Sequence, residues 1–209
     1  MTSRLPLVHL VRHGEVENPD GVIYGRLPGF GLSDRGRAQA ASAARHLGAR
    51  IASPPRVIAS PLQRAQETAR ILMEQLGATE LVLDDRLTEA DSGFEGLPRR
   101  FAPGPYLRRV VRTSSWRRAE RPIGVARRMG RAVREVAADA DTDHVVIVSH
   151  QFPIVMARIA LTWGVTDDAG PIAVRAAPLL FRRTGCALAS VSSLRFDDRE
   201  RASIDYWEP

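Results

Sequence analysis

Apolar residues along the chain form short continuous runs separated by stretches of helical spacing. The most regular run, Val-Val-Ile-Val at residues 145–148, is β-branched and continuous, which is typical of a central strand buried on both faces. Further runs at residues 5–11, 57–59 and 81–83 predict three more strands. Three segments of the tail could form edge strands: residues 178–183, 187–196 and 202–207.

The stretches between these runs carry helix signals. Ser33 or Asp34 can cap a first helix, and Gly77 follows the last apolar residue of a second helix as a stop signal. Apolar residues then recur at intervals of three and four positions. Helices are predicted at about residues 34–47, 61–76, 123–138 and 153–163.

Strands that alternate with helices predict an α/β sandwich around a mostly parallel sheet. A chain of 209 residues fits one domain, which we expect to span residues 1–209. Residues 92–125 depart from the alternation, because they are rich in proline, glycine and arginine and hold no long apolar run. We interpret them as an arginine-rich excursion, partly helical, that lies over the edge of the core where the active site is expected.

The composition narrows the class of protein. The sequence has no apolar run of about 18 residues and no secretory pattern at its start, so we expect no membrane partner. The single cysteine, Cys186, excludes an internal disulfide and fits a cytoplasmic protein. All 30 basic residues are arginine, which excludes lysine chemistry such as a Schiff base. Such one-sided use of arginine is typical of a GC-rich genome and carries no functional information. The net charge of +6 is therefore weak evidence for nucleic-acid binding, and we expect no nucleic acid partner.

Polar side chains follow three of the predicted strands. Arg12 and His13 come after the first strand, Ser60 and Arg64 after the second, and His150 after the strongest one. Ligands of open α/β sheets bind beyond the carboxyl ends of the strands. These polar side chains are therefore expected to meet at one edge of the sheet.

The residues at this edge suit phosphoryl transfer, which needs a nucleophile, positive groups around the phosphate oxygens and an acid for the leaving group. His13 and His150 with Arg12 and Arg64 supply the first two, and Glu89, after the third strand, supplies a carboxyl group. The set requires no metal and no other cofactor, because the arginines and a second histidine carry the positive charge. Neighbouring cations should also lower the pKa of His13 and keep its imidazole neutral and nucleophilic.

Four short motifs contain these residues, in chain order: Leu-Val-Arg-His-Gly-Glu at 10–15, Ser-Pro-Leu-Gln-Arg-Ala at 60–65 with Thr68, Glu89 with Gly93 and Glu95-Gly96, and Val-Ser-His at 148–150. Together they resemble the signature of the histidine phosphatase superfamily, in its phosphoglycerate mutase-like branch. Gly36 and Gln39-Ala40 also resemble the Gly-x-x-Gln-Ala helix of that family. One Arg-His-Gly triplet is a weak signal, whereas four ordered motifs are a specific one. The resemblance covers residues 7–98 and 123–163.

The resemblance implies a three-layer α/β/α sandwich and a phosphatase that acts on a small phosphorylated molecule. In such an enzyme His13 would accept the phosphoryl group as a phosphohistidine. Arg12, Arg64 and His150 would bind the phosphate oxygens. Glu89 would protonate the leaving oxygen and then activate the water that breaks the phosphohistidine.

Three further residues are candidates for binding the phosphate or the rest of the substrate. Pro19 stands where the family often has asparagine, and Asn18 lies one residue earlier. Arg26 keeps a position that is common in the family, and Gln151 replaces the glycine that often follows the last histidine. These departures affect the identity of the substrate rather than the phosphoryl chemistry.

Several alternatives stay open at the level of sequence. A mutase would use the same residues but return the phosphoryl group to a substrate, and a phospho-ligand sensor would bind without turnover. The arginines of the excursion, with Tyr106 and Trp116, could attract an anionic substrate, contact nucleic acid or form a solvated surface. Glu89 could cap a local turn instead of acting as an acid. The sequence is equally compatible with a monomer and a homodimer.

Overall fold

The computed structural model describes residues 5–91, 93–98, 120–163, 185–198 and 201–209. In chain order the elements are β1 (Leu7–Arg12), α1 (Asp34–Gly48), β2 (Arg56–Ala59), α2 (Gln63–Leu76), β3 (Leu81–Leu83), the short 3-10 helix η1 (Asp85–Leu87), α5 (Pro122–Ala138), β4 (His144–Ser149), α6 (Gln151–Trp163), β5 (Val191–Phe196) and β6 (Ala202–Trp207).

The six strands of the described residues form one sheet in the order β3-β2-β4-β1-β5-β6. The first four strands of that order are parallel, and β5 and β6 run antiparallel to their neighbours. β4 lies between β1 and β2, and residues 145–148 are fully buried. The prediction of a mostly parallel sheet around this central strand is confirmed.

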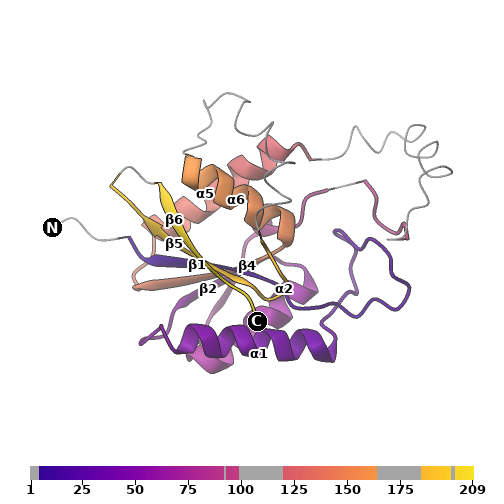
Figure 1. Ribbon diagram of the computed structural model, residues 1–209, viewed down its shortest axis with the longest axis horizontal. Coiled ribbons are helices and arrows are strands. Elements are labelled where there is room, and N and C mark those ends of the chain that lie inside the picture. Colours follow the sequence, from indigo (N-terminus) through magenta and orange to yellow (C-terminus); the bar gives the residue numbers. More distant parts are fainter. Residues whose placement is uncertain (1–4, 92, 99–119, 164–184, 199–200) are drawn as a thin grey trace.

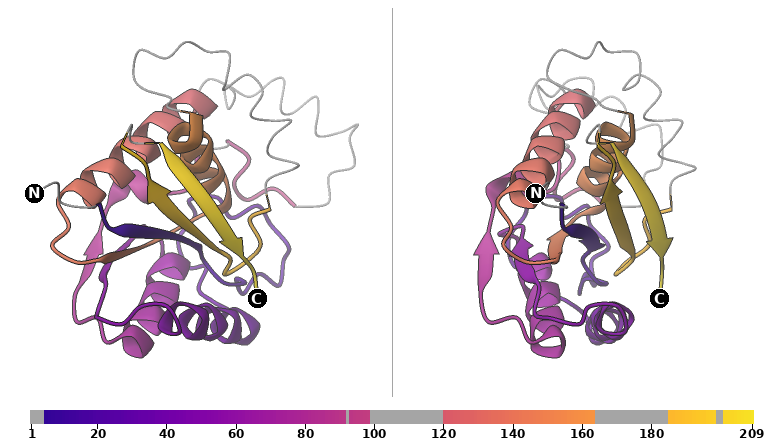
Figure 2. Two further views of the ribbon diagram at one scale, coloured as in Figure 1. Left: turned by 60° about the vertical axis from the view of Figure 1, so that its left-hand side comes forward. Right: turned by 90° about the vertical axis from the view of Figure 1, so that its left-hand side faces the viewer.

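Helices cover both faces of the sheet. Figures 1 and 2 show α5 and α6 on one face and α1 and α2 on the other. Side chains of β4 alternate between the two layers: Val145 and Ile147 pack with α5 and α6, whereas Val146 and Val148 pack with α1 and α2. The three-layer α/β/α sandwich is therefore confirmed, with an apolar core on each side of the sheet.

The start signal predicted for the first helix and the stop signal predicted for the second are confirmed. The hydroxyl of Ser33, one of the two predicted caps, accepts a hydrogen bond from the backbone N–H of Gly36 at 3.0 Å. Gly77 ends α2 in the left-handed conformation, with φ of 72°. Pro122 occupies the first turn of α5, where its missing N–H costs no helical hydrogen bond.

Several boundaries differ from the prediction. α2 begins at Gln63 rather than at residue 61, and β1 spans Leu7–Arg12 rather than residues 5–11. α6 begins at Gln151 rather than Pro153, because the carbonyl oxygen of His150 already accepts a helical bond from the N–H of Ile154. β5 pairs with both β1 and β6, so β6 is the edge strand and β5 is not. The predicted strand at 178–183 and residues 99–119 of the excursion lie outside the described residues. Within the described part of the chain, no helix is both long and apolar enough to cross a membrane.

A pair of histidines, His9 buried and His144 half-buried, joins β1 to its neighbours in the sheet. Nδ1 of His9 lies 2.9 Å from the hydroxyl of Ser193, and Nε2 lies 3.2 Å from Nδ1 of His144. The two rings stack with centroids 5.4 Å apart. Burial of His9, reinforced by the proximity of His144, lowers its pKa to about 3. His9 is therefore neutral in the folded protein over the whole range in which histidines ordinarily titrate.

This pair predicts a loss of stability in acid. Between about pH 6.5 and 3 the unfolded chain binds a proton at His9 that the folded protein does not, so stability falls as the pH drops through this window. At pH 5 the loss from this one group amounts to about 2 kcal/mol relative to pH 7. Urea unfolding at both pH values should show that His9→Gln removes this part of the acid loss. Equal losses in the native protein and the variant would contradict the prediction.

Candidate active site

The turn after β1 is shaped by a close approach of two backbone segments. A Cβ atom at Gly14 would lie 2.3 Å from the carbonyl oxygen of Gly36, and one at Gly36 would lie 2.0 Å from the carbonyl oxygen of Glu15. Only glycine fits at either position. The side-chain oxygen of Gln39 also accepts a hydrogen bond from the N–H of Glu15 at 2.9 Å. The start of α1 thus fixes the turn in which His13 lies, and this explains the Arg-His-Gly and Gly-x-x-Gln patterns.

His13 is held as a neutral ring with its hydrogen on one nitrogen and a lone pair on the other. The side chain is buried, and Nδ1 donates to the carbonyl oxygen of Gly14 at 2.7 Å, so Nδ1 carries the hydrogen and Nε2 presents a lone pair. Nε of Arg64 donates to that Nε2 atom at 3.3 Å. Burial first, and then the charges of Arg64 and Arg12, hold the pKa of His13 well below its usual range. This is the protonation state that a nucleophilic imidazole needs.

Arg64 reaches His13 from the first turn of α2. Its guanidinium is buried, donates to the carbonyl oxygen of Gly25 at 2.6 Å and lies over the ring of Tyr24, 4.7 Å from the centroid. The hydroxyl of Thr68 donates to the carbonyl oxygen of Arg64 at 2.8 Å and accepts from the N–H of Gly14 at 3.2 Å. α2 is therefore attached directly to the turn that carries His13.

His150 lies beside His13, with ring centroids 5.1 Å apart. Its Nε2 atom lies 2.8 Å from the hydroxyl of Ser60, which itself accepts from the N–H of Leu62. When the Ser60 hydroxyl donates to Nε2, the hydrogen of His150 lies on Nδ1, the tautomer in which Nδ1 is a donor. Burial holds the pKa of His150 well below its usual range, and the nearby His13 adds to the effect.

Two buried donors of the site have no partner among the described residues: Nδ1 of His150 and Nε of Arg12. The Arg12 guanidinium is anchored by a bond from another of its nitrogens to the carbonyl oxygen of Cys186, at 2.7 Å. Buried polar groups almost always have hydrogen-bond partners. Unpaired donors next to a buried arginine are the arrangement expected where a ligand supplies anionic oxygens.

Glu89 lies two residues after η1. The hydroxyl of Ser149 donates to the carbonyl oxygen of Leu87 at 2.7 Å, which ties η1 to the end of β4. One carboxylate oxygen of Glu89 accepts from the N–H of Ala90 at 2.8 Å. Burial raises the pKa of Glu89, against the opposing effects of the Ala90 N–H and Arg64. A carboxyl group of raised pKa is suited to donate a proton.

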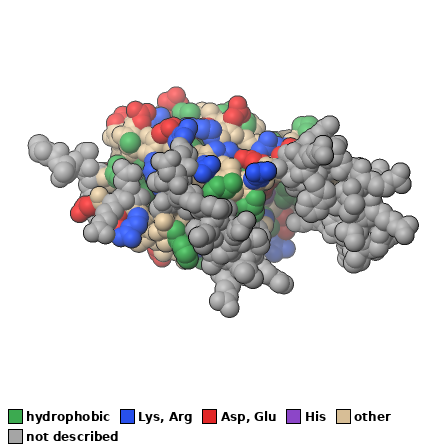
Figure 3. Space-filling model, turned by 90° about the horizontal axis from the view of Figure 1, so that it is seen from above, with side chains coloured by type: hydrophobic (Ala, Val, Ile, Leu, Met, Phe, Trp, Pro, Cys, Tyr) green, Lys and Arg blue, Asp and Glu red, His purple; other side chains and the backbone are tan. Residues whose placement is uncertain are grey.

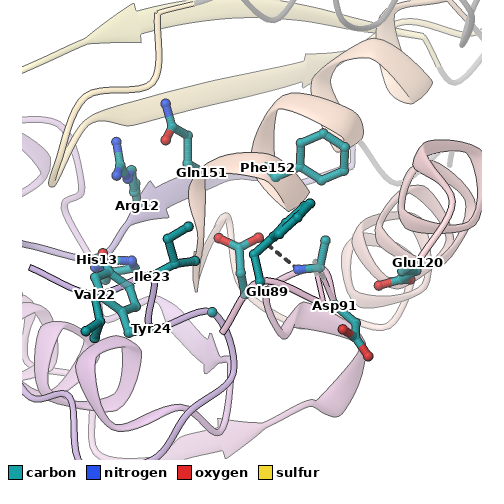
Figure 4. A pocket seen from close by; sticks show the side chains of 13 residues that line it. Arg12, His13, Val22, Ile23, Tyr24, Glu89, Asp91, Glu120, Gln151 and Phe152 are labelled. Carbon is teal, nitrogen blue, oxygen red and sulfur yellow. Dashed lines mark hydrogen bonds between the residues drawn. The ribbon is translucent and has the colours of Figure 1, made fainter. Parts of the chain in front are cut away.

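Arg12, His13 and Glu89 line a cavity of about 490 Å³, whereas Arg64 and His150 are not among its described lining residues. Figure 4 shows Arg12 and His13, at the end of β1, and Glu89, from the segment after η1, around this cavity. A volume of this size accommodates a small molecule. The described residues that line it are Arg12, His13, Val22, Ile23, Tyr24, Gly25, Glu89, Ala90, Asp91, Phe94, Glu120, Gln151 and Phe152.

The three further candidates occupy different places. Gln151 lines the cavity. Asn18 and Arg26 are not among the described lining residues, because other groups hold their side chains. Both polar atoms of the Asn18 amide bond to the backbone of Val22, and Arg26 donates to the carbonyl oxygen of Glu89 and to the carboxylate of Glu120. Phosphate contacts from Asn18 and Arg26 stay predictions.

Sequence reasoning missed two contributors to the site. Tyr24 lies over Arg64 and edge-on to His13, with ring centroids 6.3 Å apart, but no periodicity marks it within its glycine-rich loop. Ser60 belongs to the second motif, yet its bond to His150 follows only from the pairing of β2 with β4.

The described part of the chain contains no group of three histidine, cysteine, aspartate or glutamate side chains placed as metal ligands would be. Several of its surface arginines form ion pairs with acidic residues, including Arg56 with Asp139 and Arg86 with Asp84. On the face seen in Figure 3, arginines and acidic side chains are interspersed.

A family model described as the histidine phosphatase superfamily (branch 1) matches residues 8–208. The chain belongs to the histidine phosphatase superfamily. The resemblance based on four motifs is therefore confirmed. The sheet and its flanking helices match the phosphoglycerate mutase-like fold of solved members of the superfamily.

Relatives of this histidine phosphatase superfamily member include phosphatases. A mycobacterial glucosyl-3-phosphoglycerate phosphatase solved with vanadate is 29% identical, with a TM-score of 0.76 over 97% of this chain and 98% of that one. A structure named mycobacterial hydrolase 1 is 30% identical, with a TM-score of 0.75 over 99% of both chains. An uncharacterised protein of Mycobacterium tuberculosis, Rv0525, is 41% identical over 97% of this chain and 96% of its own length.

The contact between the two glycines predicts that Gly36→Ala is destabilising. The added Cβ would overlap backbone atoms of Glu15 that cannot move without displacing the turn, so the free energy of unfolding should fall by about 1–3 kcal/mol. The matched control is Gly48→Ala in the same helix, where the nearest atom to a Cβ is 3.8 Å away. Urea denaturation measures both, and a control change below about 0.5 kcal/mol is expected. Equal effects of the two variants would refute the steric account.

Proposed function

We propose that the protein is a phosphatase that hydrolyses the phosphate monoester of a small molecule through a phosphohistidine on His13, without a metal ion. The observation that carries the proposal is the state of His13. Its ring is buried and neutral, with Nδ1 committed to the carbonyl oxygen of Gly14 and the Nε2 lone pair beside Arg64. Membership of the superfamily and the 29% identical mycobacterial phosphatase support the same class of reaction.

Binding of the phosphate uses the cations and unpaired donors around His13. Arg12 and Arg64 supply two positive charges, which match a phosphate monoester dianion. The N–H groups at Nε of Arg12 and Nδ1 of His150 are buried without described partners, so phosphate oxygens would satisfy them. These contacts would also stabilise the charge on the transferring group.

In the transfer step, the Nε2 lone pair of His13 forms a bond to phosphorus as the bond between phosphorus and the ester oxygen breaks. Glu89 donates its proton to that oxygen, and the alcohol leaves. The raised pKa of Glu89 favours the protonated carboxyl group that this step requires.

In the hydrolysis step, a water molecule attacks phosphorus on the side opposite Nε2. The Glu89 carboxylate left by the first step takes the proton of that water. The bond between Nε2 and phosphorus breaks, inorganic phosphate leaves, and His13 returns to its neutral state. One carboxyl group therefore serves both half-reactions.

The first prediction concerns the nucleophile. His13→Ala should lower kcat/KM for para-nitrophenyl phosphate, measured without added metal, by roughly 10³-fold or more. The matched control is His46→Ala. The His46 ring stacks on Trp207, and neither residue is among the described residues that line the cavity. The control should retain native activity. Turnover that survives in His13→Ala would overturn the assignment of His13.

The second prediction concerns the acid. Glu89→Gln should lower kcat by roughly 10²–10⁴-fold for alkyl phosphates, whose leaving oxygens need a proton, and much less for para-nitrophenyl phosphate. In the native protein kcat/KM for an alkyl phosphate should fall as the pH rises through the raised pKa of Glu89, because only the protonated form donates. This basic limb should be absent from the variant. Equal losses on both substrates would exclude Glu89 as the acid.

A further inference from the structure

The wall of the cavity beyond the phosphate-binding groups is apolar. Val22, Ile23, Ala90, Phe94 and Phe152 form it, from three separate segments of the chain. Figure 4 shows Ile23 and Phe152 on the cavity beside Gln151, with the Glu89 carboxylate near them. The organic part of a bound monoester would leave the phosphate in this direction, past Glu89.

This wall is held by the fold. The N–H of Ile23 donates to the carbonyl oxygen of Leu97 at 2.7 Å, and its carbonyl oxygen accepts from the N–H of Gly96 at 2.8 Å. Phe152 lies in the first turn of α6, and both Phe152 and Ala90 pack against the core between the sheet and α5 and α6. The apolar surface is therefore present before any ligand binds, which reduces the entropy lost on binding.

The acidic residues of the described lining are Glu89, Asp91 and Glu120. Glu120 is paired with two arginines: Arg128 donates to both of its oxygens, at 2.6 and 2.9 Å, and Arg26 donates at 3.0 Å. The pKa of Glu89 is raised, and in the proposed mechanism Glu89 donates its proton to the ester oxygen. The contacts left for the organic part of the substrate are therefore mainly those of the apolar wall.

We propose that the substrate is the phosphate monoester of an apolar alcohol, with a ring or branched chain next to the ester. The organic group lies against Ile23, Phe94 and Phe152. This inference rests on the proposed phosphatase function and adds the class of substrate.

The proposal can be tested by comparing kcat/KM for alkyl phosphates that have similar intrinsic reactivity. The native protein should hydrolyse benzyl phosphate with a kcat/KM at least about tenfold above that for glycerol 3-phosphate or 3-phosphoglycerate. Glycerol is the slightly better leaving group, so a preference for benzyl phosphate must come from the contacts of its ring. Comparable or faster turnover of the two polar substrates, lost in His13→Ala, would overturn the substrate class and leave the phosphatase function standing.

The binding of phosphonates, which are not hydrolysed, tests the apolar wall of the cavity without turnover. Benzylphosphonate and methylphosphonate share one anionic head, so the ratio of their dissociation constants measured by calorimetry reports on the phenyl group alone. The native protein should bind benzylphosphonate at least about tenfold more tightly. Phe152→Ala and Ile23→Asn should each reduce that ratio severalfold, with little effect on methylphosphonate.

The matched control is Leu83→Ala, which removes a large apolar side chain that is 48% exposed at the edge of the sheet. It should leave the ratio unchanged. Equal affinities for the two phosphonates in the native protein would overturn the inference. A clear phenyl preference in a protein that hydrolyses no monoester would instead overturn the phosphatase function while supporting the ligand class.

Discussion

The hydrogen bond from Nδ1 of His13 to the carbonyl oxygen of Gly14 is the interaction on which the rest of the site depends. It fixes the tautomer of the ring and leaves the Nε2 lone pair beside Arg64. The turn that contains His13 and Gly14 lies so close to the start of α1 that no side chain fits at Gly14 or Gly36. The proposed nucleophile is thus oriented by a backbone carbonyl group rather than by a partner carboxylate.

Burial shifts the pKa values of the two histidines and of the carboxyl group in opposite directions. It lowers the pKa of His13 and His150 and raises that of Glu89, so that the histidines are neutral and the carboxyl group holds its proton more readily. The positive charge is left to Arg12 and Arg64. This division supplies what the proposed mechanism requires at one edge of the sheet: a nucleophile, an acid and an anion site.

The sequence predicted the parts of this arrangement that depend on local pattern. The β-branched run at 145–148 became the central strand, and the residues that follow β1, β2 and β4 met at one edge because parallel strands place their carboxyl ends together. What it missed depends on individual contacts, some between distant segments and some within one loop. Tyr24 reaches Arg64 from a loop without periodicity, and the amide of Asn18 is taken up by the Val22 backbone, which no spacing rule indicates.

The most direct test of the account is to trap the covalent intermediate. The protein would be mixed briefly with an excess of para-nitrophenyl phosphate, denatured in base, digested and analysed by mass spectrometry under conditions that preserve phosphohistidine. The account predicts an acid-labile, base-stable phosphate on the peptide that contains His13, and on its imidazole. A protein that turns over substrate but carries its phosphate on another residue, or on none, would contradict the central claim.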